Sequence, residues 1–583
     1  MEKRVVLFLV LSLGIIFAYD YLLKQMGYTP FGPTSALEQD NSQSLPSDTS
    51  SVPGTDTPPA QEPEAAGTKT FAEASETGNQ EEVQEVIVDT PLFRAGLSSR
   101  GGVLTFWELK QYLTQTEDPQ PVELVYSEGQ FPGPLSLQIP ENQNLTDRLQ
   151  KGNFSIQRDF STLDSTHPTG TVTLTYGNPL SDLWVQKELT FHFDSYLVDI
   201  AIRAQGIPEK LELLLGTNFG VVEWGQGFIG LLGSAWMIGD QLEKENPETM
   251  GASLRREGDI KWLALQDKYF MSVLIPDKAH EIFSTLESER VVTAGIVYQA
   301  DAKEQVHTAK LYAGPKQYDR LTSLGIGLED TIDFGWFIYG SWDIVKAVAK
   351  PLFSVLKFIN DYTHNFGWAI ILLTFGIKLL FVPLQYKSYK SMQGMQTIQP
   401  KVLALQEKFK DNREKLNQEL MKLYREHKVN PVGGCLPMFL QMPVFVALFN
   451  ILYMTIDLRQ APFMLWIEDL SVQDPYYVLP VLMGVSMVIQ QKIMPTSMDP
   501  TQAKMMMILP VGLTFLFVTF PAGLVLYWVT QNILTITQQV VTDRYVLKKP
   551  KPGAPSSSPP KNGHSTDPGN KKSPTKSTPS TKS

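Results

Sequence analysis

The sequence predicts a membrane protein with six transmembrane α-helices, a large antiparallel β-sandwich on the exported side and a helical hairpin in the cytoplasm. Three observations predict this fold class. An apolar run opens the chain, strand-like alternation fills residues 83–330, and five apolar segments follow within residues 367–541. The chain has 583 residues and a single cysteine, Cys435. A single cysteine excludes an intrachain disulfide and a thiolate-rich zinc or iron–sulfur centre.

Residues 1–28 predict an N-terminal transmembrane anchor. Val5–Tyr19 is an uncharged apolar run, and Lys3 and Arg4 precede it. A cleaved signal peptide is the alternative interpretation, although no A-x-A cleavage site follows the run. In either case the positive-inside rule keeps Lys3 and Arg4 in the cytoplasm and exports the residues that follow.

Residues 29–82 predict a disordered acidic linker. This segment is rich in Pro, Ser, Thr and Gly and carries ten acidic residues against one lysine. It has too little apolar surface to offset the entropy lost on ordering.

Residues 83–330 predict an exported β-sandwich domain, because short runs of apolar and polar residues alternate with period two. Leu189–Phe193 and Val198–Ile202 are examples of this alternation, and Gly, Pro and Asn bound such runs. His192 and His307 are interpreted as strand-surface residues and not as metal ligands.

Residues 331–366 predict an amphipathic region that lies on the membrane interface. An ordinary helix packed on the sandwich is the alternative. Pro351 suits the first turn of a helix better than an interior position, so a break is expected there. The predicted apolar face comprises Val345, Val348, Leu352, Val355, Leu356 and Ile359.

Five apolar segments approach the length needed to cross the hydrocarbon core. The last two could form one long helix, but the charge pattern decides between the two arrangements. Residues 385–430 carry ten Lys/Arg against five acids, and residues 542–583 carry nine against two. The positive-inside rule places both in the cytoplasm, which requires a turn at Pro521–Gly523 and two separate spans. The five segments are Gly367–Leu384, Leu436–Ile456, Tyr476–Met494, Met505–Phe520 and Gly523–Val541.

Residues 385–430 predict a cytoplasmic helical hairpin. Apolar residues recur at helical spacing on both sides of Asp411-Asn412, which marks the turn. These stripes are most simply the seam between the two helices. The stripe residues are Ile398, Val402, Leu405 and Phe409 before the turn, and Leu416, Leu420 and Leu423 after it. Residues 542–583 predict a basic disordered tail.

Lys378 is the candidate functional residue of the spans. It lies ten residues after Trp368, which is about 15 Å along a helix and near the bilayer midplane. A lysine at that depth costs roughly 2.5–3.5 kcal/mol on insertion scales, so a functional role is the default interpretation. The alternative is that its long side chain reaches the nearer interface beyond Leu384. No aspartate or glutamate lies deep in the spans, so a hydrated polar cavity around Lys378 is expected.

Long motifs resemble a known family. The run from Asn430 to Met487, the segment FPAGLVLYWVTQNIL and the segment LTFGIKLLFVPLQYKSYKSM are similar to the YidC/Oxa/Alb family of membrane protein insertases. In the exported half, WLALQDKYFMSVLIP and YAGPKQYDRL show the same resemblance. It covers nearly the whole chain except the linker and the tail.

The resemblance implies an inner-membrane protein of the Gram-negative type, with a five-helix insertase core at residues 367–541 and a periplasmic β-supersandwich. It also implies a hydrophilic groove that is open to the cytoplasm and to lipid. Lys378 takes the position of the usual arginine in this groove, which keeps the charge but loses the planar multi-donor group. The implied groove residues are Lys378, Thr374, Gln441, Tyr527, Trp528, Gln531 and Asn532.

The expected activity is the insertion and folding of nascent membrane proteins, alone or beside the SecYEG translocon and its accessory subunits, and not an enzymatic reaction. Ribosomes, held by the basic tail and the hairpin, and membrane lipids are the other expected partners. No HExxH and no GxxxxGK[ST] motif is present, so no metal or cofactor is expected.

Two other classes of protein remain as alternatives. A secondary transporter would use Lys378 as its coupling site, but the five core spans show no inverted repeat. An intramembrane Ser/Lys hydrolase would need a serine beside Lys378, and Ser486 qualifies only if the second and fourth spans meet.

Overall fold

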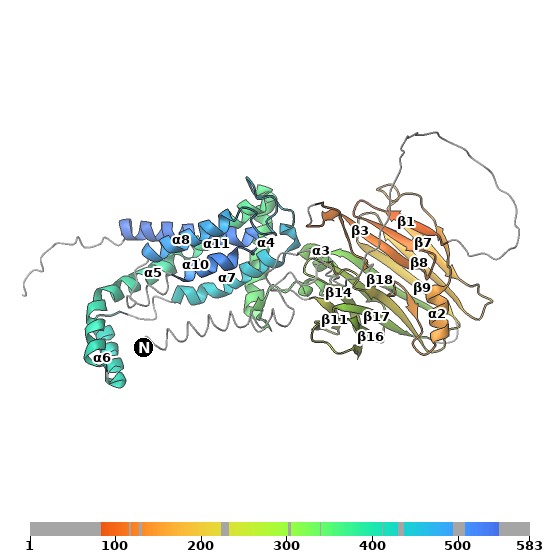
Figure 1. Ribbon diagram of the computed structural model, residues 1–583, viewed down its shortest axis with the longest axis horizontal. Helices are drawn as coiled ribbons and strands as arrows, with labels where there is room; N and C mark the ends of the chain where they lie inside the picture. Colours follow the sequence, from red (N-terminus) through yellow and green to blue (C-terminus); the bar gives the residue numbers. More distant parts are fainter. Residues whose placement is uncertain are drawn as a thin grey trace, which may run out of the picture.

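The computed structural model describes residues 83–115, 118–126, 131–222, 232–300, 305–337, 340–410, 412–429, 436–493 and 508–546. The predicted anchor, the acidic linker and the tail beyond residue 546 lie outside these residues. The described chain forms a β-rich body followed by a helical body, and α3 and α4 lie near the place where the two meet (Figure 1).

Three antiparallel sheets build the β-rich body. The first has the order β1-β2-β3-β4, with β1 (Glu85–Asp89), β2 (Phe93–Ser98), β3 (Val103–Leu113) and β4 (Pro121–Glu123). The second has the order β13-β16-β17-β10-β5, with β5 (Leu137–Gln138), β10 (Lys210–Thr217), β13 (Ser253–Glu257), β16 (Glu281–Ser288) and β17 (Val291–Gln299).

The third sheet has nine strands among the described residues, in the order β12-β11-β14-β15-β18-β9-β8-β7-β6. These are β6 (Ser155–Arg158), β7 (Thr169–Tyr176), β8 (Trp184–His192), β9 (Leu197–Gln205), β11 (Gly233–Ile238), β12 (Gln241–Glu245), β14 (Ile260–Gln266), β15 (Phe270–Pro276) and β18 (Gln305–Pro315). A short pair, β19 (Trp336–Phe337) and β20 (Gly340–Ser341), follows.

The predicted alternation of apolar and polar residues gives β8 and β9 one buried face and one more exposed face. Leu189 pairs with Ile200 and Phe191 with Val198, and all four side chains are buried. His192 lies on the other face, where its Nε2 is 2.8 Å from Asp199 Oδ2. In this pair of strands the apolar side chains Leu189, Phe191, Val198 and Ile200 face the core, whereas His192 and Asp199 face outward.

The helical body follows the β-rich body in the chain. Its helices are α4 (Asp343–Thr363), α5 (Phe366–Lys408), α6 (Arg413–Glu426), α7 (Leu436–Met454), α8 (Val478–Ile493), α10 (Leu509–Phe517) and α11 (Ala522–Val541). Shorter helices are α2 (Gln143–Lys151), α3 (Tyr318–Ser323), η1 (Leu328–Thr331), η3 (Ile456–Leu458) and η4 (Thr542–Val546). Among the described helices α5 alone is long and apolar enough to cross a membrane by length and composition, and residues 439–454 and α8 form shorter apolar helices.

The predicted break at Pro351 is wrong, because α4 runs through this proline without interruption. Proline removes one helical hydrogen bond, the bond to the carbonyl of Ala347. Both Pro351 and Ala347 are exposed, so water or lipid headgroups can satisfy that carbonyl.

The buried face of α4 also differs from the predicted one. Val355 is 45% exposed, whereas Ala349 and Phe353 are buried. The ring of Phe353 lies 5.5 Å from the ring of Tyr318 and 5.2 Å from that of Phe334, centroid to centroid, and α4 also packs on α5 and α7. Contacts with both bodies set the rotation of this helix, and periodicity alone does not reveal them.

The helices on either side of Asp411-Asn412 pack against each other. Asn412 caps α6, since its side-chain oxygen accepts a hydrogen bond of 3.0 Å from the backbone N–H of Lys415. Ile398, Val402 and Leu423 form the buried seam. These three residues belong to the predicted stripes.

The chain reverses between α10 and α11. The rings of Phe517 and Trp528 are 4.6 Å apart, although eleven residues of continuous helix would separate them by about 16 Å. Pro521 lies at the cap of α11, and the backbone N–H groups of Ala522 and Gly523 donate to Val472 and Leu470. Two helices, and not one, therefore occupy residues 509–541.

Candidate functional site

The candidate site lies on α11, where this helix packs against α5 on one side and against α8 on another. Lys378 of α5 is only 6% exposed, and its ammonium donates a hydrogen bond of 2.7 Å to Thr535 Oγ1 of α11. Thr535 in turn donates to the carbonyl of Gln531, at 2.6 Å. Within the described residues no carboxylate lies within 4 Å of this ammonium. Lys378 therefore points into the helix packing and not along the outer surface of α5.

A second hydrogen bond joins α11 to α8 at nearly the same depth. Asn532 Nδ2 donates to Ser486 Oγ, at 2.9 Å, and both side chains are buried. Ser486 donates to the carbonyl of Met483, at 2.7 Å. Asn532 and Thr535 are three residues apart, so they share one face of α11. This face links Lys378 to Ser486 through two interhelical hydrogen bonds, and we call these four residues the polar seam.

The seam continues one turn further along α11. Gln539 is 1% exposed, and its Nε2 donates to the carbonyl of Ile493, at 2.8 Å. The side-chain oxygens of Gln539 and Gln385 are buried and accept no hydrogen bond within the described structure. Gln385 lies seven residues after Lys378 and hence on the same face of α5.

Thr374, Gln441 and Gln531 have different surroundings. Thr374 is buried one turn before Lys378, and its hydroxyl donates to the carbonyl of Ile370 in its own helix, at 2.6 Å. Gln441 and Gln531 are half-buried. In the described part of the chain none of the three side chains forms a hydrogen bond with Lys378.

The two aromatic candidates lie nearer the start of α11. Tyr527 and Trp528 precede Thr535 by eight and seven residues, which is about 10–12 Å along the helix. Tyr527 is 3% exposed and Trp528 is half-buried. Phe445 of α7 lies 6.3 Å from Tyr527 and 5.0 Å from Trp528, measured between ring centroids. They form an aromatic layer separate from the polar seam.

Thr535, Ser486 and Gln539 are not among the groove residues that the sequence analysis names, although Ser486 appears there as the serine that a Ser/Lys hydrolase would use. A signal for two of them exists, because Asn532, Thr535 and Gln539 recur at the i, i+3, i+7 spacing of one helical face. Ser486 carries no such signal, since it depends on which helix lies beside α11.

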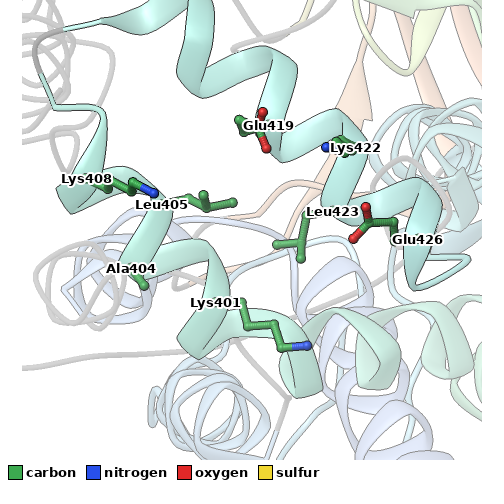
Figure 2. Close-up of a pocket in the computed structure, with 8 residues that line it drawn as sticks. All are labelled: Lys401, Ala404, Leu405, Lys408, Glu419, Lys422, Leu423 and Glu426. Carbon is green, nitrogen blue, oxygen red and sulfur yellow. The ribbon is translucent and has the colours of Figure 1, made fainter.

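A distinct groove of about 430 Å³ lies between α5 and α6 (Figure 2). Lys401 is 23 residues beyond Lys378, about 34 Å along α5, so this groove is not part of the polar seam. Its lining comprises Lys401, Ala404, Leu405, Lys408, Glu419, Lys422, Leu423 and Glu426.

Family comparisons cover both bodies. Residues 85–355 match the family described as YidC periplasmic domain, and residues 358–549 match the family described as 60Kd inner membrane protein. The membrane protein insertase YidC of Syntrophus aciditrophicus is 37% identical over 553 residues, which cover 92% of this chain and 99% of that protein.

The chain belongs to the YidC family of membrane protein insertases. A second YidC, from Geotalea daltonii, is 36% identical over 93% of this chain and 99% of its own length. A crystal structure of an active YidC insertase with its first transmembrane domain resolved covers 78% of this chain, at 20% identity and a TM-score of 0.33.

YidC proteins are insertases and not enzymes. The two family matches place the β-rich body in the periplasm and the helical body in the inner membrane. The resemblance found in the sequence is thereby confirmed. The transporter alternative is not favoured.

Proposed function

We propose that this chain inserts nascent membrane proteins into the inner membrane through a polar groove formed at the seam of α5, α8 and α11. The observation that carries the proposal is the partly buried hydrogen bond between Lys378 and Thr535, 2.7 Å long. In this bond the ammonium of Lys378, which lies among apolar helices, is held by a hydroxyl and not by a carboxylate. Such a charge is costly in a membrane, which favours a functional role.

The physical task of an insertase is to lower the barrier for a polar flank that must cross hydrocarbon. A transmembrane segment gains free energy on entering lipid, but its charged flank loses hydration. A half-depth groove that offers an ammonium and several hydroxyl and amide groups replaces part of that hydration. An acidic flank benefits most, because Lys378 is cationic. Thr374, Gln441, Gln531 and Asn532 add polar groups, and Tyr527 and Trp528 add an aromatic contact for the apolar segment.

We propose six transmembrane spans with both termini in the cytoplasm and residues 29–366 in the periplasm. Support comes from the loop between α7 and α8, because Arg459 in this loop donates to the carbonyl of Leu113 in the β-rich body, at 2.9 Å. A loop that touches the periplasmic domain belongs on the periplasmic side. The α5–α6 hairpin then lies in the cytoplasm, in agreement with its ten basic residues.

The proposed domain boundaries follow this topology. They are 1–28 for the anchor, 29–82 for the linker, 83–330 for the β-sandwich, 331–366 for the interfacial region, 367–541 for the core with its hairpin at 385–430, and 542–583 for the tail. Trp342 at the cap of α4, and Ile344, Phe358 and Tyr362 within α4, are exposed, which supports contact with lipid.

Proposed partners are nascent membrane proteins, ribosomes and the SecYEG translocon with its accessory subunits. The lysines that line the hairpin groove, together with those of the tail, support an attraction to ribosomal RNA phosphates.

Reconstitution tests the function. The purified chain in liposomes should integrate a small membrane protein synthesised in its presence, measured by protease protection of the client. Liposomes without the chain and liposomes with a heat-denatured chain are the controls. Equal integration in all three preparations contradicts the proposal.

A further inference from the structure

The loop between α7 and α8, residues 455–477, docks on the β-rich body. Arg459 is only 6% exposed, although it belongs to this loop. One guanidinium nitrogen donates to the carbonyl of Leu113 at the end of β3, at 2.9 Å. The same guanidinium lies 5.4 Å from the ring centroids of both Tyr269 and Phe270. A cation held against two aromatic faces and a carbonyl is a specific contact between the bodies.

The two aromatic residues that Arg459 contacts, Tyr269 and Phe270, lie at the turn between β14 and β15. Asp267 Oδ1 accepts hydrogen bonds from the backbone N–H groups of Tyr269, at 2.8 Å, and Phe270, at 2.7 Å. The carbonyl of Tyr269 accepts from the backbone N–H of Lys316, at 2.7 Å. These bonds hold the backbone that carries the two rings.

Further polar contacts surround this point. Gln115 Nε2 donates to Ser471 Oγ of the loop, at 3.2 Å. The ammonium of Lys268 lies 4.0 Å from the ring centroid of Tyr453, near the end of α7. Both contacts join the β-rich body to the same loop or its flanking helix.

A second set of contacts holds the segment of the chain that connects the two bodies. Asn450 of α7 is fully buried, and its Nδ2 donates to the carbonyl of Phe334, at 2.7 Å. Three residues earlier, the carbonyl of Thr331 accepts from the buried ammonium of Lys316, at 3.3 Å. The segment from residue 331 to residue 334 is thus held by the helical body and by the β-rich body.

We infer that Arg459 latches the periplasmic domain onto the helical body and that the two stay docked while a client is inserted. The loop of residues 455–477 joins α7 and α8, which carry Phe445 of the aromatic layer and Ser486 of the polar seam. Docking therefore fixes the periplasmic ends of two helices that line the proposed groove. Arg459 is a positioning residue, since it touches neither the seam nor the client, and its effect on insertion rests on the proposed function.

A reversible lock tests whether the bodies stay together. Gln115→Cys and Ser471→Cys, in a Cys435→Ser background, allow a short, cleavable thiol crosslinker to join the bodies in membranes. We expect high crosslinking yield and unchanged insertion by the locked protein in proteoliposomes. Insertion that stops on locking and returns on cleavage of the crosslinker overturns the inference.

Arg459→Ala, added to the two cysteine substitutions, tests the latch itself. Loss of a charge-assisted hydrogen bond should lower the docking equilibrium constant about ten-fold, so the crosslinking yield should fall. Arg459→Lys should restore part of the yield, and Arg256→Ala, on an exposed strand of the same domain, should leave it unchanged. An unchanged yield in Arg459→Ala contradicts the latch whether or not the protein inserts clients.

Rescue separates positioning from folding. Insertion by the Arg459→Ala protein should fall, and the crosslink should restore it in the molecules that become joined. Failure of that rescue rules out a positioning role for Arg459. If the unsubstituted protein inserts no client, the proposed function fails, while the crosslinking yields still decide the docking.

Discussion

At the scale of single residues, Lys378 combines a cation with a hydroxyl partner inside a packed helix bundle. Its bond to Thr535 crosses from α5 to α11. The arginine that the family resemblance leads one to expect at this position would present a planar group with several donors. Lysine offers a compact charge on a flexible chain, and one hydroxyl, that of Thr535, holds it here.

Lys378→Ala should slow insertion of clients with acidic flanks about ten-fold or more, because a hydrogen bond to a charged group is worth about 1.5–3 kcal/mol. Lys378→Arg keeps the charge and should be tolerated. The measurement is protease protection of clients with graded flank charge in proteoliposomes. Equal insertion by Lys378→Ala and the unsubstituted protein across that series removes Lys378 from the mechanism.

A second lysine is buried in the β-rich body. Lys187 of β8 is fully buried, and its ammonium donates to the carbonyls of Leu135, at 3.0 Å, of Gly101, at 3.3 Å, and of Gly102. Burial lowers the pKa of Lys187 to about 7, well below its ordinary value. The unfolded chain keeps the ordinary pKa of about 10.4, so between these values it binds a proton that the folded chain lacks.

The stability of the β-rich body should therefore rise with pH from about 7 to about 10, by at most about 1.4 kcal/mol per pH unit for each such lysine. Below pH 7 both states are protonated and the contribution is constant. Burial also lowers the pKa of Lys316 to about 7, so Lys187→Met should remove only part of the slope. Thermal unfolding of the full-length protein in detergent measures it, with exposed Lys278→Met as the control. A slope that Lys187→Met leaves intact contradicts this assignment.

At the scale of elements, the decisive feature is the reversal between α10 and α11. Phe520 and Ala522 are buried at this reversal, while Thr519 is exposed. Proline at residue 521 suits the cap, because it needs no hydrogen-bond donor there. The reversal brings Trp528 back against Phe517 and sends α11 toward the proposed cytoplasmic side.

Thr519→Cys, in a Cys435→Ser background, should react with an impermeant maleimide added outside intact spheroplasts. Ser556→Cys should react only after lysis, because the nine basic residues of the tail favour the cytoplasm. Gel mobility of the labelled chain gives the readout. Labelling of Ser556→Cys from outside overturns the six-span topology and the proposed orientation of the seam.

At the scale of the whole molecule, charge is distributed unequally between its parts. The linker at residues 29–82 carries ten acids against one lysine, and residues 548–582 include eight lysines. An acidic segment on one side of the membrane and a basic segment on the other agree with the proposed orientation. Dense lysines attract nucleic-acid phosphates through counterion release, which salt weakens.

Truncation after Val546 should weaken co-sedimentation with ribosomes and reduce its dependence on salt. Insertion of ribosome-independent clients should persist, because the polar seam is intact. Replacing the tail lysines by glutamine at full length is the matched control for chain length. If ribosome association at low salt is unchanged by the truncation, the tail does not bind ribosomes and its charge serves only to set the membrane topology.

Local patterns in the sequence were enough for several features. Strand alternation around Leu189 and Val198 and the helix start at Asn412 depend on neighbours within a few residues, and the two-helix arrangement around Pro521 follows from the charge balance of the flanking segments. Periodicity, capping and charge balance report such features directly. The depth of Lys378 in its apolar segment is another property of this kind.

Only the tertiary structure decided which groups meet. Thr535 as the partner of Lys378, Ser486 as the partner of Asn532, and the docking of Arg459 on Leu113 join residues 157, 46 and 346 positions apart. Pro351 inside α4 belongs here too, because packing against both bodies outweighs one lost hydrogen bond. The Lys378–Thr535 and Asn532–Ser486 pairs lie on helices and share one physical reason. A helix repeats its faces every few residues, so its sequence shows that a polar face exists but not which neighbouring element the fold turns toward it.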